Sequence, residues 1–449
     1  MQYINSGGEF DLSIKIGVIS LGCSKNLVDT EIILGNLARY GFQIVNSAQD
    51  ADVIIVNTCG FIDTAKQEAV NTILEMSEYR TKGKCQALIV IGCLVERFKD
   101  DIMKEIPEVD AVVRIKEYSE IIEIIKGLLK IKKYEKNVLL VDDYINRLRS
   151  TPPSIAYLKI AEGCDNRCSY CIIPNIRGHY ISRKMEDILS EARNLGKQGV
   201  KELTVIAQDT TRYGIDIYGE YKLAELLKKL CEVQGIEWIR LMYAYPESVS
   251  DEIIDVIANE NKICKYIDLP IQHINDRVLK AMNRRTTGKQ IRELIKKLRA
   301  KVPGIVIRTS VIVGFPGETE EEFNELYEFI KEIKFDRLGT FAYSKEEGTP
   351  AAKFKEQLPY KIKKARQSSI MKIQNQISKT VNEQFVGKDT EVLIEGTTTK
   401  GSYFGRTYRD APEIDGFVYI KSKRALIPGE IESARINKAT EYDLFGGIE

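Results

Sequence analysis

The sequence predicts an α/β protein in three parts: an amino-terminal domain with a parallel sheet, a partial (βα)6 barrel, and a small antiparallel β-barrel at the carboxyl end. Two observations predict this organisation. Apolar, β-branched runs alternate with helix-like segments through most of the chain, and short β-type runs with Gly and Asp/Pro turns follow near its end. A break at Pro152 and Pro153 divides the alternating region. We therefore place the domains at 14–130, 150–380 and 382–449.

Charge and composition exclude several classes of protein. Lys and Arg number 66 and Asp and Glu number 65, so the whole chain gives no sign of a polyanionic partner. No run of about 18 apolar residues is present, so we expect no membrane span. The chain begins with acidic side chains and no apolar stretch of the kind a signal peptide needs. With nine cysteines, this predicts a cytoplasmic protein whose clustered thiols bind metal rather than form disulfides.

The first domain contains a repeated pattern of strand, cysteine and helix. Three apolar runs each end in a cysteine that precedes a helix-like segment: residues 15–23, 51–59 and 85–93, which end in Cys23, Cys59 and Cys93. Parallel strands share a direction, so we expect these three thiols at the same carboxyl edge, where open α/β sheets bind ligands. Cys85 lies at the opposite end of its run and is expected to pack in the core.

The second domain contains six strand-like runs separated by helix-like segments: 155–161, 202–207, 237–243, 265–269, 305–313 and 337–343. Six βα units predict a barrel or partial barrel with its site in the carboxyl-end loops. The loop after the first run reads "AEGCDNRCSYCII", with Cys164, Cys168 and Cys171 in eight positions. Cys231 and Cys264 fall in helix-like segments without partners at ligand spacing, so we expect them to pack.

The terminal β-domain has nine Lys and Arg against eleven Asp and Glu over residues 386–449, a net charge of −2. Domains that bind RNA are normally basic, because phosphate contacts dominate their affinity. This charge balance predicts that the domain binds a protein rather than RNA. The alternative is that the domain binds nothing and has only a structural role.

Three closely spaced cysteines without a fourth narrow the choice of metal. Structural zinc takes four ligands, and the nearest histidine, His179, lies eight residues past Cys171. Iron–sulfur clusters are normally held by four thiolates. Three thiolates leave one iron of a 4Fe-4S cluster open to a reacting molecule, so the missing fourth cysteine favours a catalytic cluster.

The spacing Cys-x3-Cys-x2-Cys, with Tyr170 before the last cysteine, resembles the signature of radical S-adenosylmethionine enzymes. The resemblance implies that the open iron binds the amino and carboxylate groups of S-adenosylmethionine. One electron then cleaves S-adenosylmethionine to methionine and a 5′-deoxyadenosyl radical. The cofactor carries the difficult chemistry, and the protein orients it and excludes side reactions.

The resemblance extends over nearly the whole chain to the methylthiotransferases, which join a three-cysteine amino-terminal domain, a radical barrel and a terminal TRAM domain. The segments "SLGCSKNLVDTE", "VNTCGFIDTAKQEAV" and "GCLVERF" are similar to the branch that modifies ribosomal protein S-twelve rather than the MiaB branch that modifies tRNA. The net charge of −2 in the terminal domain favours the same branch. The tRNA adenosine methylthiotransferases remain the alternative.

This resemblance implies a second 4Fe-4S cluster on Cys23, Cys59 and Cys93, again with one open iron that carries sulfur. One S-adenosylmethionine methylates that sulfur, and a second yields the radical that removes hydrogen from the β-carbon of an aspartate in S-twelve. No catalytic residue beyond the cluster ligands is expected, because that carbon has no acidity for a base to exploit. The implied partners are S-twelve, free or in the small ribosomal subunit, a sulfur donor, and a low-potential electron donor of the flavodoxin or ferredoxin type.

Contacts to S-adenosylmethionine are less well marked. Radical enzymes of this class often carry Gly-Gly-Glu after the second strand, and here Ala207-Gln208-Asp209 departs from that motif. Gln208 and Asp209 are our candidates to take the place of this motif. The alternative is that these two residues only end the strand and bind nothing. The run "VIVGFPGETEEEF" resembles the late glycine motif near the adenine, which favours Gly314, and Arg308 on the same strand is a weaker candidate.

Two other classes of protein remain open. A two-cluster electron carrier would explain six cysteines but needs neither open irons nor a barrel, and it would form no 5′-deoxyadenosine from S-adenosylmethionine. An RNA-binding module with structural clusters would need a basic groove or stacking aromatics in the terminal domain. Its aromatic side chains meet that need in part, and its acidic balance counts against it.

Overall fold

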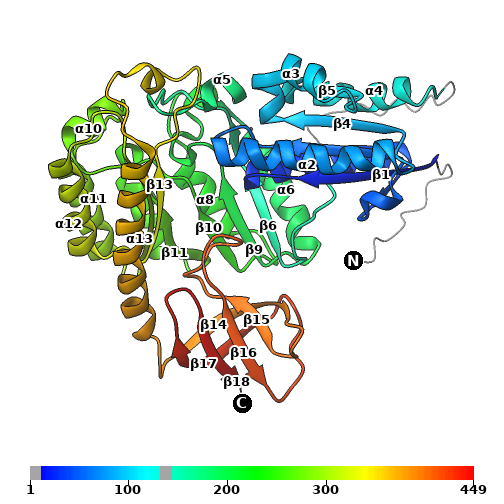
Figure 1. The fold of residues 1–449 in the computed structure, drawn as a ribbon. Helices are drawn as coiled ribbons and strands as arrows, with labels where there is room; N and C mark the ends of the chain where they lie inside the picture. The colour runs from blue at the N-terminus through cyan, green and yellow to red at the C-terminus, as the bar shows by residue number, and fades with distance from the viewer. Residues whose placement is uncertain (1–11, 132–143, 449) are drawn as a thin grey trace. The chain divides into compact units, whose positions relative to one another are not determined.

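The computed structural model describes residues 12–131 and 144–448, and the first eleven residues, where no signal peptide is expected, lie outside these ranges. The chain forms two compact units (Figure 1): residues 1–150 with 175–177, and residues 151–174 with 178–449. Within the described ranges, no helix combines the length and the apolar character that crossing a bilayer requires.

The first unit contains a fully parallel five-stranded sheet in the order β2-β1-β3-β4-β5. Its strands are β1 (Leu12–Ser20), β2 (Phe42–Val45), β3 (Val53–Thr58), β4 (Ala87–Gly92) and β5 (Ala111–Val113). Its helices are α1 (Ser24–Tyr40), α2 (Asp63–Thr81), α3 (Cys93–Glu105) and α4 (Ile121–Leu128), with 3₁₀ turns at Ala48–Asp50 and Ile115–Glu120. The three cysteine-ending runs are the central strands β1, β3 and β4, as predicted. The short outer strands β2 and β5 were not predicted.

Side chains alternate along β3 between two apolar cores. Val53 and Ile55 pack with the core that contains Leu37 of α1, whereas Ile54 and Val56 pack with the core that contains Ile73 of α2. This period of two is the geometry of a strand, and burial on both faces explains why β3 and β4 read as continuous apolar runs.

The second unit contains a six-stranded parallel sheet in the order β13-β12-β11-β10-β9-β6, which is the reverse of chain order. Its strands are β6 (Ile155–Lys159), β9 (Glu202–Ile206), β10 (Trp238–Leu241), β11 (Ile263–Asp268), β12 (Val306–Val313) and β13 (Arg337–Ala342). They match the six predicted runs and confirm the partial (βα)6 barrel. A two-stranded antiparallel sheet, β7 (Ala161–Glu162) and β8 (Ile181–Ser182), flanks the three-cysteine loop.

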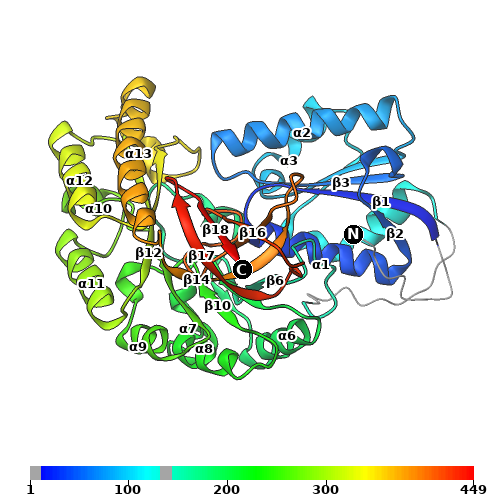
Figure 2. The same cartoon turned by 90° about the horizontal axis from the view of Figure 1, so that it is seen from below.

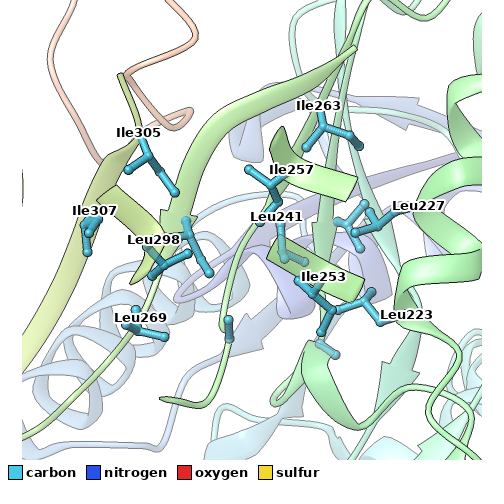
Figure 3. Packing of buried hydrophobic residues seen from close by; sticks show 14 of the residues in the cluster. Leu223, Leu227, Leu241, Ile253, Ile257, Ile263, Leu269, Leu298, Ile305 and Ile307 are labelled. Carbon is cyan, nitrogen blue, oxygen red and sulfur yellow. The ribbon is translucent and has the colours of Figure 1, made fainter. Parts of the chain in front are cut away.

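Helices lie along the outer side of this curved sheet (Figure 2). They are α6 (Met185–Lys197), α7 (Ile215–Tyr218), α8 (Leu223–Cys231), α9 (Asp251–Asn259), α10 (Asp276–Ala281), α11 (Gly288–Lys301) and α12 (Glu320–Ile333), with 3₁₀ turns at Thr210–Arg212, Pro246–Ser248 and Pro350–Lys353. The short helix α5 (Ile173–Arg177) follows the three-cysteine loop, and its residues 175–177 belong to the first unit. Apolar side chains of strands and helices fill the space between the layers (Figure 3), among them Leu241 and Ile307 against Leu227, Ile257 and Leu298. Burial of this apolar surface holds the helices on the sheet.

The long helix α13 (Tyr360–Glu383) leads into a closed five-stranded barrel in the order β14-β15-β16-β18-β17. Its strands are β14 (Asp389–Thr397), β15 (Tyr403–Arg406), β16 (Val418–Ser422), β17 (Ile431–Ala439) and β18 (Leu444–Ile448). The interior holds Val392, Ile394, Val418, Ile420 and Ile436. The pairing is antiparallel apart from β16 with β18, so the predicted small β-barrel is present with one parallel contact.

Buried ion pairs join the small five-stranded barrel to the six-stranded sheet, near the amino-terminal ends of the sheet's strands. Glu202, the first residue of β9, accepts hydrogen bonds at 2.6 Å from Arg240 of β10 and from Arg406 of β15, and all three side chains are fully buried. Arg337 at the start of β13 pairs with Asp410 at 2.6 Å. Burial alone would raise the pKa of Glu202, but the two guanidinium groups hold that pKa below its usual range. The carboxylate is therefore ionised and neutralises charge from both barrels.

Replacing Glu202 by Gln should lower the free energy of unfolding by about 3–5 kcal/mol, because two buried guanidinium groups lose their shared counter-ion. Urea unfolding of the full-length protein measures this change. Glu237→Gln is the matched control: Glu237 is half exposed and lies 3.8 Å from Lys201, so its loss should cost less than about 1 kcal/mol. Equal effects of the two substitutions would show that the buried network is not a major source of stability.

Candidate functional site

Three cysteines of the first unit follow three neighbouring strands. Cys23 caps the amino end of α1 after β1, Cys59 follows β3 directly, and Cys93 follows β4 and begins α3. Gly22, with a φ of 90°, lies so close to Cys59 that a Cβ on it would stand 2.7 Å from the Cys59 Cβ. The three thiols therefore share the carboxyl edge of the sheet, as their spacing predicted.

The environments of these three thiols differ. Cys23 is exposed, Cys59 is partly exposed and Cys93 is buried. Burial raises the pKa of Cys93 to about 12, and the guanidinium of Arg177 opposes that rise. Arg177 belongs to the first unit, donates from Nη2 to the Cys93 Sγ at 3.7 Å, and is held by Asp29 at 2.9 Å. Cys93 is thus a neutral thiol at pH 7 beside a cation that favours its thiolate.

Cys164, Cys168 and Cys171 lie in the loop between β7 and α5, beyond the carboxyl end of β6. Hydrogen bonds at the middle of the loop fix its path: Ser169 donates from N to the Met282 carbonyl at 2.9 Å and from Oγ to the Ala281 carbonyl at 2.7 Å. Burial raises the pKa of Cys164 to about 11 and also raises the pKa of Cys171. Metal binding to these thiols would therefore release protons.

Two side chains from distant segments surround Cys168. Arg284 donates from Nη1 toward the Cys168 Sγ at 4.0 Å, and the Tyr245 hydroxyl lies 4.0 Å from the same sulfur. The Arg284 guanidinium also stacks on the Tyr245 ring, with 4.3 Å to its centroid. A cation and a hydroxyl group thus lie beside a thiol that the sequence predicts to bind metal.

Both sets of three cysteines offer thiolate sulfur as the donor atom. Iron–sulfur clusters are held by Cys thiolates, so the residue types of both sets fit such a cluster. Over residues 12–131 and 144–448, no three His, Cys, Asp or Glu side chains lie close enough together to share one ion.

Gln208 and Asp209 follow β9 and contact the three-cysteine loop. The Gln208 Nε2 donates to Glu162 at 2.7 Å, and the Asp209 Oδ2 accepts from the Asn166 Nδ2 at 2.7 Å. Asp209 also caps the following 3₁₀ turn by accepting from the Thr211 backbone N. Both candidates therefore support the loop, and their contact with S-adenosylmethionine stays a prediction.

Arg308 and Gly314 lie at different ends of β12. Arg308, near its start, pairs with Asp268 at 2.6 Å and lies 3.7 Å from Asp415 of the small barrel. Gly314 follows the carboxyl end with a φ of 71°, and a Cβ there would stand 2.5 Å from the Lys363 Cγ. These contacts account for both residues structurally, and their roles toward S-adenosylmethionine also stay predictions.

The remaining cysteines pack, with one difference from the predicted secondary structure. Cys85 is buried and contacts the Ala87 carbonyl, and Cys231 ends α8. Cys264 lies in strand β11, not in a helix as predicted, because its run begins two residues earlier than expected. Sequence reasoning missed Arg284 and Tyr245 as neighbours of Cys168, since no local signal links residues so far apart in the chain. Asn166, which donates to Asp209, lies between Cys164 and Cys168. Its position within the cysteine motif is a signal by which the sequence could have identified it as a site residue.

Three segments match known families. Residues 158–330 match the Radical SAM superfamily, residues 15–114 match the uncharacterized protein family UPF0004, and residues 386–448 match the TRAM domain. The first range covers the end of β6 and all of β9 to β12, but not β13. The second range covers the first parallel sheet apart from the start of β1, and the third contains the small β-barrel.

Full-length relatives decide the family. The chain is 55% identical to the ribosomal protein uS12 methylthiotransferase RimO of Alkaliphilus oremlandii, over 97% of this chain and 99% of that protein. It is 51% identical to RimO of Acetivibrio thermocellus, over 97% and 98% of the two chains. The chain belongs to the RimO family. Members of this family are radical S-adenosylmethionine methylthiotransferases, so the chain is an enzyme of that class.

Solved structures outside the RimO family share the fold. The radical S-adenosylmethionine methyltransferase TsrM of Kitasatospora setae aligns with a TM-score of 0.57 at 15% identity, over 75% of this chain and 76% of TsrM. The cobalamin-dependent radical enzyme OxsB aligns with a TM-score of 0.50 at 14% identity, over 80% of this chain and 56% of OxsB. At these identities the likeness concerns the arrangement of strands and helices.

In the metal-free protein, iodoacetamide should label Cys23 well before Cys93 at pH 7, because Cys93 is buried and its thiol pKa is about 12. Labelling of Cys93 should rise about tenfold for each pH unit between 7 and 9, as its thiolate fraction grows. Peptide mass spectrometry measures the rates, and urea-unfolded protein is the control. Equal rates for the two cysteines in folded protein would contradict the described burial.

Proposed function

We propose that this chain methylthiolates the β-carbon of an aspartate in ribosomal protein S-twelve, using two 4Fe-4S clusters and S-adenosylmethionine. The observation that carries the proposal is the pair of three-cysteine sets, each at a carboxyl edge of a parallel sheet, in a chain of the RimO family. When bound, the clusters and S-adenosylmethionine supply the radical chemistry that an unactivated C–H bond requires. The target follows from the names of the relatives, which act on uS12.

In this proposal the six cysteines are the metal ligands, with three thiolates for each cluster. Cys164, Cys168 and Cys171 hold the cluster that binds S-adenosylmethionine, and Cys23, Cys59 and Cys93 hold the cluster that carries sulfur. Gln208 and Asp209 keep the first loop in place through Glu162 and Asn166. Such fixed side chains reduce the reorganisation needed to position a bound cofactor.

The further contacts proposed for S-adenosylmethionine are Gln208, Asp209 and Gly314. Arg308 is the weakest of the candidates, because its guanidinium is already paired with Asp268. The burial of Cys164 and Cys168 limits access of water and oxygen to the first cluster. We place the enzyme in the cytoplasm, where S-twelve, a sulfur donor and a flavodoxin- or ferredoxin-type electron donor would meet it.

The alternative substrate, tRNA, is supported by one feature of the small barrel. Phe404, Tyr419 and Phe445 lie in register across β15, β16 and β18, and the last two rings stack at 5.3 Å between centroids. Lys438 lies 5.5 Å from the Phe445 ring centroid. Partly exposed rings beside a cation are the elements of a surface on which bases stack.

The charge of the small barrel favours neither substrate strongly once burial is considered. Glu395, Asp410 and Asp415 are occupied by arginines, and Arg406 and Arg409 are buried with them. Without these five, seven basic and eight acidic side chains remain over residues 386–449. Steering of a basic ribosomal protein by net charge is therefore weaker than the sequence suggested.

Anaerobically reconstituted protein should contain about eight irons, as two four-iron clusters require. Replacing Cys164, Cys168 and Cys171 together by Ala should leave about four irons, and replacing Cys23, Cys59 and Cys93 should do the same. Iron analysis and Mössbauer spectra measure both. The control is Cys231→Ala, which should keep all eight irons because Cys231 ends a helix outside either set. Four irons in the unaltered protein would exclude the two-cluster proposal.

Given both substrates in one anaerobic reaction, the enzyme should add about 46 Da, the mass of CH2S, to S-twelve and leave tRNA unmodified, because the relatives act on the ribosomal protein. Mass spectrometry of S-twelve and nucleoside analysis of tRNA measure the two outcomes. Methylthio-adenosine in tRNA with unmodified S-twelve would establish the alternative. The Tyr419→Ala variant distinguishes the two substrate hypotheses further. Loss of a stacking ring should weaken binding of RNA, whereas modification of a protein substrate should depend less on this ring.

A further inference from the structure

Arg284 is a buried cation with an incomplete set of partners. Its side chain is 1% exposed, and its Nη2 lies 3.2 Å from both the Glu247 carboxylate and the Pro270 carbonyl. Its Nε has no hydrogen-bond partner among the described residues. The remaining hydrogen-bond contact is the long approach of Nη1 to the Cys168 Sγ at 4.0 Å. A buried guanidinium is normally paired more fully than this, because its desolvation is costly.

The arrangement around Arg284 fixes its charge in place. The planar guanidinium stacks on Tyr245, 4.3 Å from the ring centroid, and a lysine could not reproduce both the stacking and the forked hydrogen bonds. Burial raises the strength of its interaction with any nearby charge, because the effective dielectric constant is lower than in water. A metal-bound Cys168 would be a thiolate, so Arg284 would then lie beside an anion.

We infer that Arg284 tunes the reduction potential of the cluster held by Cys164, Cys168 and Cys171, by placing a fixed positive charge beside the Cys168 sulfur. This inference rests on the proposed function, since it requires a cluster at these cysteines. Arg284 is a positioning and tuning residue and takes no part in bond making or breaking.

The direction of the effect follows from charge. On reduction, the oxidised cluster accepts one electron from a reductant such as dithionite, and its charge becomes more negative by one. A nearby cation stabilises the reduced form more than the oxidised form, so Arg284 raises the potential. Glu247 partly offsets Arg284, because it is the one carboxylate paired with that guanidinium in the described chain. Removing the arginine should lower the potential, and removing the carboxylate should raise it.

The experiment is a potentiometric titration followed by electron paramagnetic resonance. It uses full-length protein in which Cys23, Cys59 and Cys93 are replaced by Ala, so that one cluster gives the signal. S-adenosylmethionine is left out, so a changed contact to it cannot alter the result. Arg284→Gln should shift the reduced-to-oxidised ratio about tenfold toward the oxidised form, about 59 mV for one electron. Glu247→Gln should shift the ratio the opposite way, and Arg284→Lys should lie between Arg284→Gln and the parent.

Arg285→Gln is the matched control, because it removes the same charge from the next residue, which is exposed to solvent and screened. Its potential should equal that of the parent. Iron content is measured for every variant, and a value of about four per chain shows that the cluster is intact. If the Arg284→Gln variant loses iron, the Glu247→Gln variant tests the inference instead. A raised potential in Glu247→Gln supports the tuning role, and a lowered potential contradicts it.

Four outcomes distinguish a failure of this inference from a failure of the proposed function. A parent protein without a four-iron cluster would contradict the proposed function. An intact cluster whose potential is the same in the parent and in the Arg284→Gln variant would overturn the tuning role alone, as would a lowered potential in Glu247→Gln. In a separate titration with S-adenosylmethionine, weaker binding to Arg284→Gln together with an unchanged potential would overturn the tuning role and assign Arg284 to the cofactor instead.

Discussion

The common direction of parallel strands is the constraint on which both candidate metal sites depend. In the first unit, β1, β3 and β4 run side by side and each ends next to a cysteine, so three residues far apart in the chain meet at one edge. In the second unit, the loop after β6 carries all three cysteines, and the loops after β9 and β10 bring Asp209 and Tyr245 toward it. An antiparallel sheet would send alternate strand ends to opposite edges.

The other end of the barrel strands has a structural task. Glu202, Arg240 and Arg406 form a buried network there that ties the small barrel to β9 and β10. Arg308 and Asp415 extend it toward β12, and Tyr266 donates to Asp415 at 2.7 Å. The buried ion pairs lie at the amino ends of the strands, whereas the cysteine loop lies at the carboxyl ends. The charges that stabilise the fold are therefore kept away from the thiols. In the small barrel, Glu395, Asp410 and Asp415 are paired with arginines and so are not available to a partner.

Each set of cysteines has one buried arginine close to one of its sulfurs. Arg177 lies 3.7 Å from the Cys93 Sγ, and Arg284 lies 4.0 Å from the Cys168 Sγ. At Cys93, burial disfavours the thiolate, and the guanidinium of Arg177 offsets part of that cost without itself losing its proton. Cys93 would therefore release its proton when it binds a metal.

The sequence by itself determined the alternating strands and helices, the shared edge of Cys23, Cys59 and Cys93, the three-cysteine loop and the small β-barrel. These are local or periodic properties, and the direction of parallel strands converts spacing into position. Only the tertiary structure decided that Arg284 and Tyr245 stand beside Cys168, and that Arg308 pairs with Asp268 and Asp415. The short outer strands β2 and β5 also depended on it, because three or four residues carry too little periodicity to identify a strand. Contacts between residues far apart in the chain follow from packing, and packing leaves no local pattern in the sequence.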